Sequence, residues 1–219
     1  MSFVQRPDTG PTASASRTRS AAPLSTRTLG PDAFTSACGD LLRLVERDYT
    51  PALLVGVRTG GLVVAETMAE FASPPLPVLP LTCRRPSTSF KSRLPGLKPL
   101  LGALPESLLN ALRRAEHHIV TGNRRAVRPT EINLAEAIAI GNWVRMSGGP
   151  KRVLVVDDAV DSGVTLATVL RTLRAACPND MTLRIAVITV TTPDPAVAPD
   201  YALHRGVLCR FPWSFDAPR

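Results

Sequence analysis

The chain has few aromatic residues, no long apolar run and no clustered cysteines, and each absence narrows the class of protein. Aromatic residues make up 5% of the 219 positions, which is little for a protein that stacks nucleic-acid bases on aromatic side chains. No apolar run approaches the ~20 residues of a membrane-spanning helix, which argues against an integral membrane protein. No CxxC pair is present, which argues against a zinc ribbon and gives no reason to expect a disulfide framework. We therefore expect a cytoplasmic protein with free thiols at Cys38, Cys83, Cys177 and Cys209.

Common phosphate and metal motifs are also missing. The sequence contains neither the Walker pattern GxxxxGKS/T nor the dinucleotide fingerprint GxGxxG. His117, His118 and His204 show no HExxH or similar metal-ligand spacing. A phosphate or metal site in this chain must therefore be built from another pattern.

Positive charge is concentrated in one segment. The chain has a net charge of +8. Residues 82–130 contain ten basic residues against Glu106 and Glu116, which accounts for the whole excess, and basic and acidic residues cancel elsewhere. Such a segment suits a polyanionic partner, either nucleic acid or a small molecule with several phosphates. The alternative is a solvated basic surface without a partner.

The composition divides the chain into a tail, one α/β domain and an insertion. Residues 1–30 are rich in Ser, Thr, Ala, Arg and Pro, so we expect a disordered tail, although an organellar transit peptide has a similar composition. Residues 31–219 are expected to form the domain, and residues 82–130 interrupt its pattern. Helices are predicted over 32–48, 62–71, 131–146 and 165–176, and strands over 52–57, 78–81, 152–156, 183–189 and 207–211.

Strands that alternate with helices predict a parallel sheet with helices on both faces. In such sheets, sites form at the loops that leave the C-terminal ends of strands. Two loops meet this condition, at 58–61 and at 157–163.

The second loop belongs to the stretch VLVVDDAVDSGVTL, which carries the most specific pattern in the chain. Asp157 and Asp158 follow a buried strand, where two carboxylates can accept hydrogen bonds from the vicinal hydroxyls of a ribose or hold a hydrated Mg²⁺. Ser162 and Thr165 offer hydroxyl donors, and Gly163 lets the amides of the next helix approach a phosphate. Two acids after a strand are more often a solvated loop or a helix cap, but the following DSGxT pattern favours a site for ribose 5-phosphate.

This stretch resembles the signature with which type I phosphoribosyltransferases bind 5-phosphoribosyl pyrophosphate (PRPP), with Ser162 in place of the commoner Thr. VGVRTGGL, over 55–62, is similar to the pyrophosphate loop of that family. The peptide at this turn is often cis in the family, here Val57–Arg58 or Arg58–Thr59. CRFPW, over 209–213, resembles a segment of xanthine–guanine-type members in which the Trp stacks on the base. The resemblance covers about residues 50–81 and 131–213 and implies the parallel sheet of that family, with 82–130 as a flexible loop and a hood that selects the base.

The resemblance also implies a reaction and a set of site residues. The family transfers the 5-phosphoribosyl group from PRPP to a nitrogenous base, releases pyrophosphate, uses Mg²⁺ and often forms dimers. Asp161 near the attacked nitrogen and Lys91 in the flexible loop are the catalytic candidates, and Trp213 is the candidate for base binding. The candidates for PRPP binding are Asp157, Asp158, Ser162, Gly163, Val164, Thr165, Arg58, Thr59 and Gly60, of which Asp157 and Asp158 are also the metal candidates.

One departure from the family leaves the acceptor open. Many 6-oxopurine enzymes carry a Lys at the end of the strand after the signature helix, where this chain reads ITVTTP over 188–193. We therefore favour a purine-like acceptor and keep a biosynthetic enzyme with a non-purine acceptor as one alternative. A catalytically weak regulator of the same fold that binds nucleic acid is the other, because the basic segment suits it.

Overall fold

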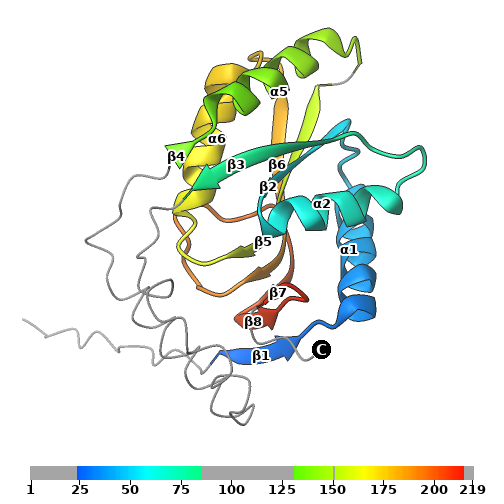
Figure 1. Ribbon diagram of the computed structural model, residues 1–219, viewed down its shortest axis with the longest axis vertical. Coiled ribbons are helices and arrows are strands. Elements are labelled where there is room, and N and C mark those ends of the chain that lie inside the picture. The colour runs from blue at the N-terminus through cyan, green and yellow to red at the C-terminus, as the bar shows by residue number, and fades with distance from the viewer. Residues whose placement is uncertain (1–23, 85–130, 150, 215–219) are drawn as a thin grey trace, which may run out of the picture.

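The computed structural model describes residues 24–84, 131–149 and 151–214 of the chain. The strands are β1 Ser25–Thr28, β2 Leu53–Arg58, β3 Val78–Arg84, β4 Glu131–Ile132, β5 Arg152–Val160, β6 Thr182–Val190, β7 Tyr201–Arg205 and β8 Val207–Arg210. The helices are α1 Pro31–Glu46, α2 Gly60–Glu70, α5 Leu134–Met146 and α6 Val164–Ala176. Six strands form one sheet in the order β4-β3-β2-β5-β6-β7, and β1 pairs with β8 in a separate sheet (Figure 1). Every pair is parallel except β3–β4, which confirms the predicted α/β class.

The central strands are buried on both faces because helices cover both sides of the large sheet. Leu54 of β2 and Leu154 of β5 pack with α1 and α2 on one face. Their neighbours Leu53 and Val153 pack with α5 and α6 on the other face. Since side chains alternate along a strand, burial on both faces requires the continuous apolar runs that the sequence shows here.

Helix α1 forms where local sequence and burial agree. Pro31 lies in the first turn together with Asp32, a carboxylate that suits the positive end of the helix dipole. Its buried residues recur at helical spacing, from Phe34 through Leu41 to Val45. The helix predicted over 32–48 is therefore confirmed, although it ends two residues earlier.

Three short strands are not predicted by the sequence pattern. β1 corrects the expected tail of residues 1–30, because residues 25–28 pair with β8 and Leu29 is buried; residues 1–23 lie outside the described part. β4 replaces the first two residues of the helix predicted over 131–146. β7 lies in a stretch for which no strand is predicted. Strands of two to five residues lack a readable apolar pattern, and they form because a neighbouring strand offers main-chain hydrogen bonds.

Strand β5 extends four residues beyond its predicted end at 156. Asp157 pairs with Val187, and Ala159 pairs with Thr189 of β6. The two adjacent acids therefore lie within the strand, which corrects their expected place in a loop. Main-chain pairing continues here although the side chains become polar, because ladder hydrogen bonds do not depend on side-chain polarity.

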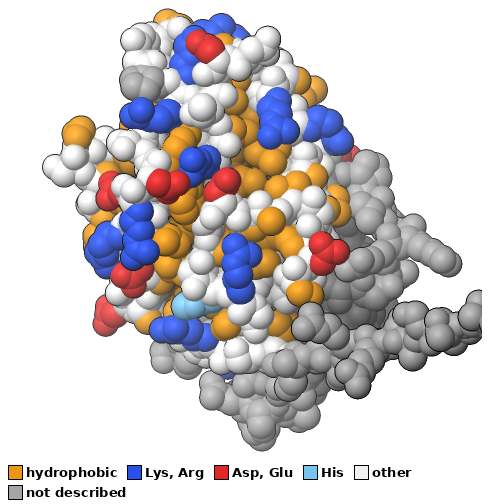
Figure 2. Space-filling model, turned by 180° about the vertical axis from the view of Figure 1, so that it is seen from behind, with side chains coloured by type: hydrophobic (Ala, Val, Ile, Leu, Met, Phe, Trp, Pro, Cys, Tyr) orange, Lys and Arg blue, Asp and Glu red, His pale blue; other side chains and the backbone are white. Residues whose placement is uncertain are grey.

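The cysteine and charge predictions can be checked on the described residues. All four cysteines are free thiols, as their spacing predicts. On the face shown in Figure 2, basic and acidic side chains are interspersed with apolar ones. Most of the basic segment predicted as an insertion, residues 85–130, lies outside the described residues, whereas residues 82–84 belong to β3. No helix among the described residues is long and apolar enough to cross a membrane.

The strand order places a topological switch point between β2 and β5. From β2 the chain passes through α2 to β3, and from β5 it passes through α6 to β6 on the opposite side. The loops after β2 and β5 therefore diverge and leave a crevice at the C-terminal edge of the sheet, where α/β proteins commonly bind ligands.

Candidate functional site

A cleft of about 420 Å³ lies at this switch point. It is bounded by the ends of β2, β3 and β5 and by the first residues of α2 and α6. The two loops selected from the sequence therefore meet at one place in the fold. The lining residues are Val57, Arg58, Thr59, Gly60, Cys83, Asp157, Asp158, Ala159, Asp161 and Thr165.

Local hydrogen bonds hold the two adjacent acids at the end of β5. The Asp158 amide donates to Asp157 Oδ1 at 3.0 Å, and the Ala159 amide donates to Asp158 Oδ1 at 2.9 Å. A side chain that accepts a hydrogen bond from the next main-chain amide is restricted in its orientation.

The start of α2 encloses Asp158. A Cβ added to Gly60 would overlap the Asp158 carboxylate, so only glycine lets the helix begin this close to β5. Burial raises the pKa of Asp158 above its usual 3.8, although hydrogen bonds from Asp157, the Ala159 amide and Trp213 act in the opposite direction. The ionised form is therefore held in a place that disfavours charge, a common property of functional carboxylates.

The raised pKa predicts that ionised Asp158 destabilises the folded chain at neutral pH. A carboxyl whose pKa is higher in the folded state favours folding fully below pH 3.8, and this stability is lost as the pH rises through the folded pKa. Asp158→Asn cannot ionise, so it is expected to raise the midpoint of thermal unfolding at neutral pH, by about 2–4 °C for each kcal/mol regained. Near pH 4 the difference should shrink. Thermal unfolding of both proteins across this pH range measures it, and a lower midpoint for the variant at pH 7 contradicts the prediction.

Two helices begin at the cleft without the features that usually neutralise a helix N-terminus. Neither α2 nor α6 has a side-chain cap, and neither has an acidic residue in its first turn. By contrast, α5 is capped by Asn133, whose side chain accepts from two amides, and α1 carries Asp32. The partial positive charge of α2 and α6 therefore remains available to an anionic ligand.

The loop after β5 packs against the segment that follows β6. The Ser162 carbonyl accepts a hydrogen bond from the Ala196 amide at 2.8 Å. Gly163 has φ 73°, and a Cβ there would lie 2.7 Å from the Val197 nitrogen. This glycine therefore meets both a left-handed backbone conformation and a close backbone neighbour.

Thr191, at the end of β6, fixes the third acid of the cleft. Its hydroxyl donates to the Asp161 carboxylate, and the residue is 3% exposed. The Thr191 amide also donates to the Val160 carbonyl at 2.9 Å. A residue 30 positions away along the chain thus helps to orient Asp161.

Most of the predicted site residues lie together at the cleft, and a few do not line it. Ser162, Gly163 and Val164 belong to the loop and helix start beside the cleft but do not line it. Lys91 lies outside the described residues. Cys83, Ala159 and Thr191 contribute to the site without having been selected from the sequence, because no motif marks them and the strands that carry them are longer than the apolar pattern indicates. The cis peptide predicted at one of two bonds is found at Arg58–Thr59.

Trp213 follows β8 and is not among the described residues that line the cleft. Its side chain is 40% exposed. One ring face is stacked on Phe211, with centroids 5.0 Å apart and an interplanar angle of 3°. The base-stacking role that the resemblance implies stays a prediction.

The donor set of the cleft fits a Mg²⁺ ion completed by a ligand. Mg²⁺ prefers oxygen donors and commonly uses one or two carboxylates together with water and phosphate oxygens. Asp157 and Asp158 supply two carboxyl groups that line the same cleft. No group of three or more acidic, His or Cys side chains that could hold a metal occurs among the described residues, so the remaining ligands would come from substrate and water.

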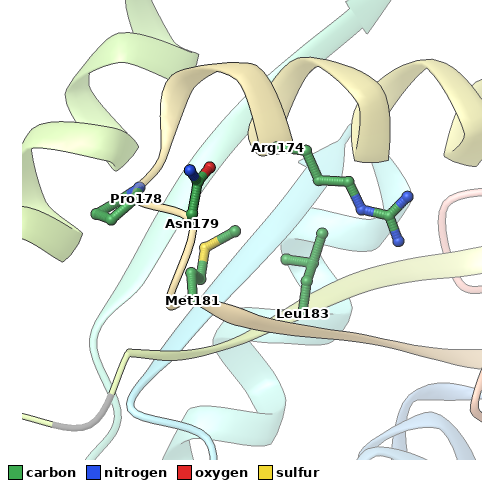
Figure 3. Close-up of a pocket in the computed structure, with 5 residues that line it drawn as sticks. All are labelled: Arg174, Pro178, Asn179, Met181 and Leu183. Atoms are coloured by element: carbon green, nitrogen blue, oxygen red, sulfur yellow. The ribbon is translucent and has the colours of Figure 1, made fainter.

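A second hollow lies at the opposite end of the sheet. It measures about 310 Å³ and is lined by the end of α6, the following turn and the start of β6 (Figure 3). Among the described residues that line it, Arg174 alone is charged, beside Asn179 and the apolar Met181 and Leu183. These described residues include no acid or nucleophile, and α6 ends here with the negative end of its dipole. We therefore place the candidate chemistry at the switch-point cleft.

Comparison with known proteins finds relatives by structure alone. No family model and no curated protein matches the chain by sequence. Among solved structures, a Helicobacter pylori xanthine–guanine–hypoxanthine phosphoribosyltransferase is 18% identical, with a TM-score of 0.55 over 87% of this chain and 95% of its own. A Pyrococcus horikoshii purine phosphoribosyltransferase is 20% identical, with a TM-score of 0.53 over 86% of this chain and 94% of its own. A Neisseria gonorrhoeae hypothetical protein with bound ppGpp is 16% identical, with a TM-score of 0.54 over 88% and 90%.

These similarities agree with the position of the two loops in the fold. The loop after β2, with its cis peptide, and the loop that leads from β5 into α6 occupy neighbouring strand ends. Similarity below 25% identity establishes the architecture and leaves substrate identity to experiment. The chain therefore has the type I phosphoribosyltransferase fold, as its signature stretch indicates.

Proposed function

We propose that the chain is a phosphoribosyltransferase that transfers the 5-phosphoribosyl group from PRPP to a nitrogenous base, with release of pyrophosphate. One observation carries the proposal. Two acids and two uncapped helix N-termini border the same cleft, so hydroxyl acceptors lie beside two anion-binding ends. PRPP has this distribution of groups, since its ribose diol lies between a 5-phosphate and a pyrophosphate.

Each part of the donor has a partner in the cleft. Asp157 and Asp158 accept hydrogen bonds from the ribose hydroxyls. The start of α6, with Ser162, Gly163, Val164 and Thr165, holds the 5-phosphate through main-chain amides and hydroxyls. The start of α2, with Arg58, Thr59 and Gly60, holds the pyrophosphate, and the guanidinium of Arg58 neutralises part of its charge.

The reaction breaks the bond between ribose C1 and the pyrophosphate oxygen and forms a bond between C1 and a ring nitrogen of the base. Bound Mg²⁺, held by Asp157 and Asp158, would neutralise charge on the leaving pyrophosphate. Asp161 lies at the cleft and accepts the proton that the attacking nitrogen loses. The basic segment that contains Lys91 would cover the site and exclude water, and this role remains an expectation because the segment lies outside the described residues.

The acceptor is proposed to be purine-like, without the lysine that many 6-oxopurine enzymes use. Strand β6 ends at Val190, and the hydroxyl of the next residue, Thr191, donates a hydrogen bond to the Asp161 carboxylate. A screen of purines, pyrimidines and other nitrogen heterocycles with PRPP and Mg²⁺, followed by pyrophosphate release, tests the proposal. Release that depends on one acceptor supports it. Absence of release with every acceptor, together with absence of PRPP binding by calorimetry, contradicts it.

The alternative of a regulator that binds nucleic acid is favoured by the local charge of residues 82–130. It predicts binding to RNA or DNA that weakens steeply with salt, because each neutralised phosphate releases counterions. A filter-binding titration at several salt concentrations distinguishes the two functions. Tight, salt-dependent binding without turnover of any acceptor selects the regulator.

The Neisseria structure suggests a further ligand for the same cleft. That protein binds ppGpp, a guanosine nucleotide with two pyrophosphate groups. We expect nucleotides of this kind to compete with PRPP here, because the amides at the start of α2 can hold either pyrophosphate. Competition should raise the apparent KM for PRPP and leave kcat unchanged, and inhibition that lowers kcat alone contradicts it.

Removing the Thr191 hydroxyl is expected to slow turnover without unfolding the chain. Thr191→Val keeps the shape of the side chain but removes this hydrogen bond to the Asp161 carboxylate. A hydrogen bond to a charged group contributes about 1.5–3 kcal/mol, so kcat should fall roughly tenfold or more if the carboxylate turns away. Thr191→Ser keeps the hydroxyl and is the matched control. Equal kcat for the valine and serine variants at equal stability argues against this role.

A further inference from the structure

The start of α5 holds the end of β3 through one carboxylate. Glu136, in the first turn of α5, accepts two hydrogen bonds from Thr82 of β3. The Thr82 amide donates to Oε2 at 2.5 Å, and the Thr82 hydroxyl donates to Oε1 at 3.1 Å. Both oxygens of the carboxylate are therefore engaged by a single residue that lies 54 positions earlier in the chain.

Thr82 is held by its main chain as well as by its side chain. Its carbonyl accepts from the Asn133 amide at 3.0 Å, so both of its main-chain polar groups bind the start of α5. The Asn133 side chain in turn caps α5 and accepts from the Glu136 amide at 3.3 Å. The start of α5 thus satisfies main-chain groups of β3 as a neighbouring strand would, at a place where an unsatisfied group would cost stability.

The end of β3 supports one side of the cleft. Thr82 is the register partner of Arg58, the last residue of β2, and the next residue, Cys83, lines the cleft. Leu81 is fully buried, whereas the residues after it are half-buried or exposed. Apolar packing therefore holds β3 as far as Leu81, and the strand end beyond it depends on hydrogen bonds such as those that Glu136 accepts.

We infer that Glu136 is a positioning residue for the pyrophosphate group of the donor, which it serves by fixing the end of β3 beside Arg58. The inference rests on the proposed function, in which Arg58 and the start of α2 hold the pyrophosphate. Glu136 is not among the described residues that line the cleft. Its contribution therefore passes through Thr82 and the strand end.

Glu136→Ala is expected to weaken binding of the pyrophosphate end of the donor and to spare the 5-phosphate end. Alanine accepts neither hydrogen bond, so the end of β3 can shift relative to Arg58. The Kd for pyrophosphate with Mg²⁺ should then rise about tenfold. The Kd for ribose 5-phosphate should change little, because that phosphate is proposed to bind at the start of α6. Calorimetry with each ligand measures the two constants.

Two further variants separate positioning from a loss of stability. Glu136→Gln keeps the size of the side chain, and its amide group can accept from the Thr82 amide and donate to the hydroxyl, so it should restore most of the affinity for pyrophosphate. Tyr49→Phe removes hydrogen bonds to the carbonyls of Val153 and Thr182, at the starts of β5 and β6 and thus opposite the cleft. It should lower the midpoint of thermal unfolding and leave both Kd values unchanged.

Thr82→Val tests the same contact by a milder change, which matters if Glu136→Ala does not fold. Valine lacks the hydroxyl but keeps the hydrogen bond from the main-chain amide, so the Kd for pyrophosphate should rise by a smaller factor. In the Glu136→Ala background the carboxylate is already absent, and Thr82→Val should add little to the loss.

Wild-type affinity for pyrophosphate in both Glu136→Ala and Thr82→Val overturns the inference, as does an equal loss for pyrophosphate and ribose 5-phosphate. An effect of Glu136→Gln as large as that of Glu136→Ala also overturns it, because charge rather than hydrogen bonding would then be responsible. In these cases PRPP binding and turnover by the wild type leave the proposed function standing. If the wild type binds neither PRPP nor pyrophosphate, the proposed function fails, and the inference fails with it.

Discussion

Replacement of both Asp157 and Asp158 by asparagine is expected to lower kcat for phosphoribosyl transfer by at least ~10³-fold while the chain stays folded. Removal of one preorganised polar group from a catalytic site commonly costs 10²–10³-fold in kcat, and here two charges are lost together. Asparagine retains the size of the side chains, but it carries no charge for Mg²⁺ and turns an N–H₂ group toward the ribose hydroxyls. Pyrophosphate release under saturating PRPP and base measures the loss, and circular dichroism with thermal unfolding verifies the fold.

A matched control separates the effect of site charge from that of charge in general. Asp180 forms an ion pair with Lys151 at 2.7 Å, and its side chain is 66% exposed. Asp180→Asn should leave kcat and KM unchanged, because an exposed pair contributes little and lies at the opposite end of the sheet. If the double variant retains activity, Asp157 and Asp158 do not have the role that the proposed mechanism gives them, whether or not PRPP still binds.

Gly163→Ala is expected to be the most damaging single substitution in the loop that we propose holds the 5-phosphate. A non-glycine residue at φ 73° costs about 1 kcal/mol or more. The added Cβ would also lie 2.7 Å from the Val197 nitrogen and 3.0 Å from the Ala196 nitrogen, where backbone atoms have little room to move. Displacement of the loop should raise the KM for PRPP about 10²-fold, because the amides at the start of α6 no longer meet the phosphate.

Gly206 offers a comparison at nearly the same backbone conformation. Its φ is 69°, but a Cβ there would meet nothing within 4 Å. Gly206→Ala should therefore lose only the stability that the left-handed conformation costs and should keep the wild-type KM for PRPP. Chemical denaturation and kinetics on both variants separate strain from steric displacement. Equal KM values for the two variants would show that the loop tolerates the added methyl group.

The sequence predicts the central elements well because burial on both faces leaves a strong pattern. β2 and β5 are continuous apolar runs that end in glycines or acids, and α1 shows apolar residues at helical spacing. β1, β4 and β7 are short and partly polar, so their formation depends on a partner strand that local sequence does not reveal. The extension of β5 through Asp157 and Asp158 escapes prediction for the same reason, because main-chain pairing with β6 continues past the apolar run.

The sequence predicts the motifs of the candidate site, but it does not predict the distant residues that contact them. The two loops at the cleft were selected because strand ends, glycines, acids and hydroxyls occur there in a fixed order. Thr191 directly follows another strand, β6, and lies 30 residues beyond Asp161. Long-range contacts of this kind are set by the tertiary fold, and one sequence carries no signal for them. The contacts of Lys91 lie outside the described residues, so its role continues to rest on resemblance.

The pairing of β2 with β5 fixes the spacing of the two helix starts at the cleft. These helix starts follow adjacent parallel strands, joined in register from Leu53–Val153 to Gly56–Val156, and such strands lie about 4.8 Å apart. Main-chain hydrogen bonds therefore set this spacing, whatever side chains the two strands carry. If the helix starts hold the two phosphate ends of the donor as proposed, their separation tolerates extensive change in sequence.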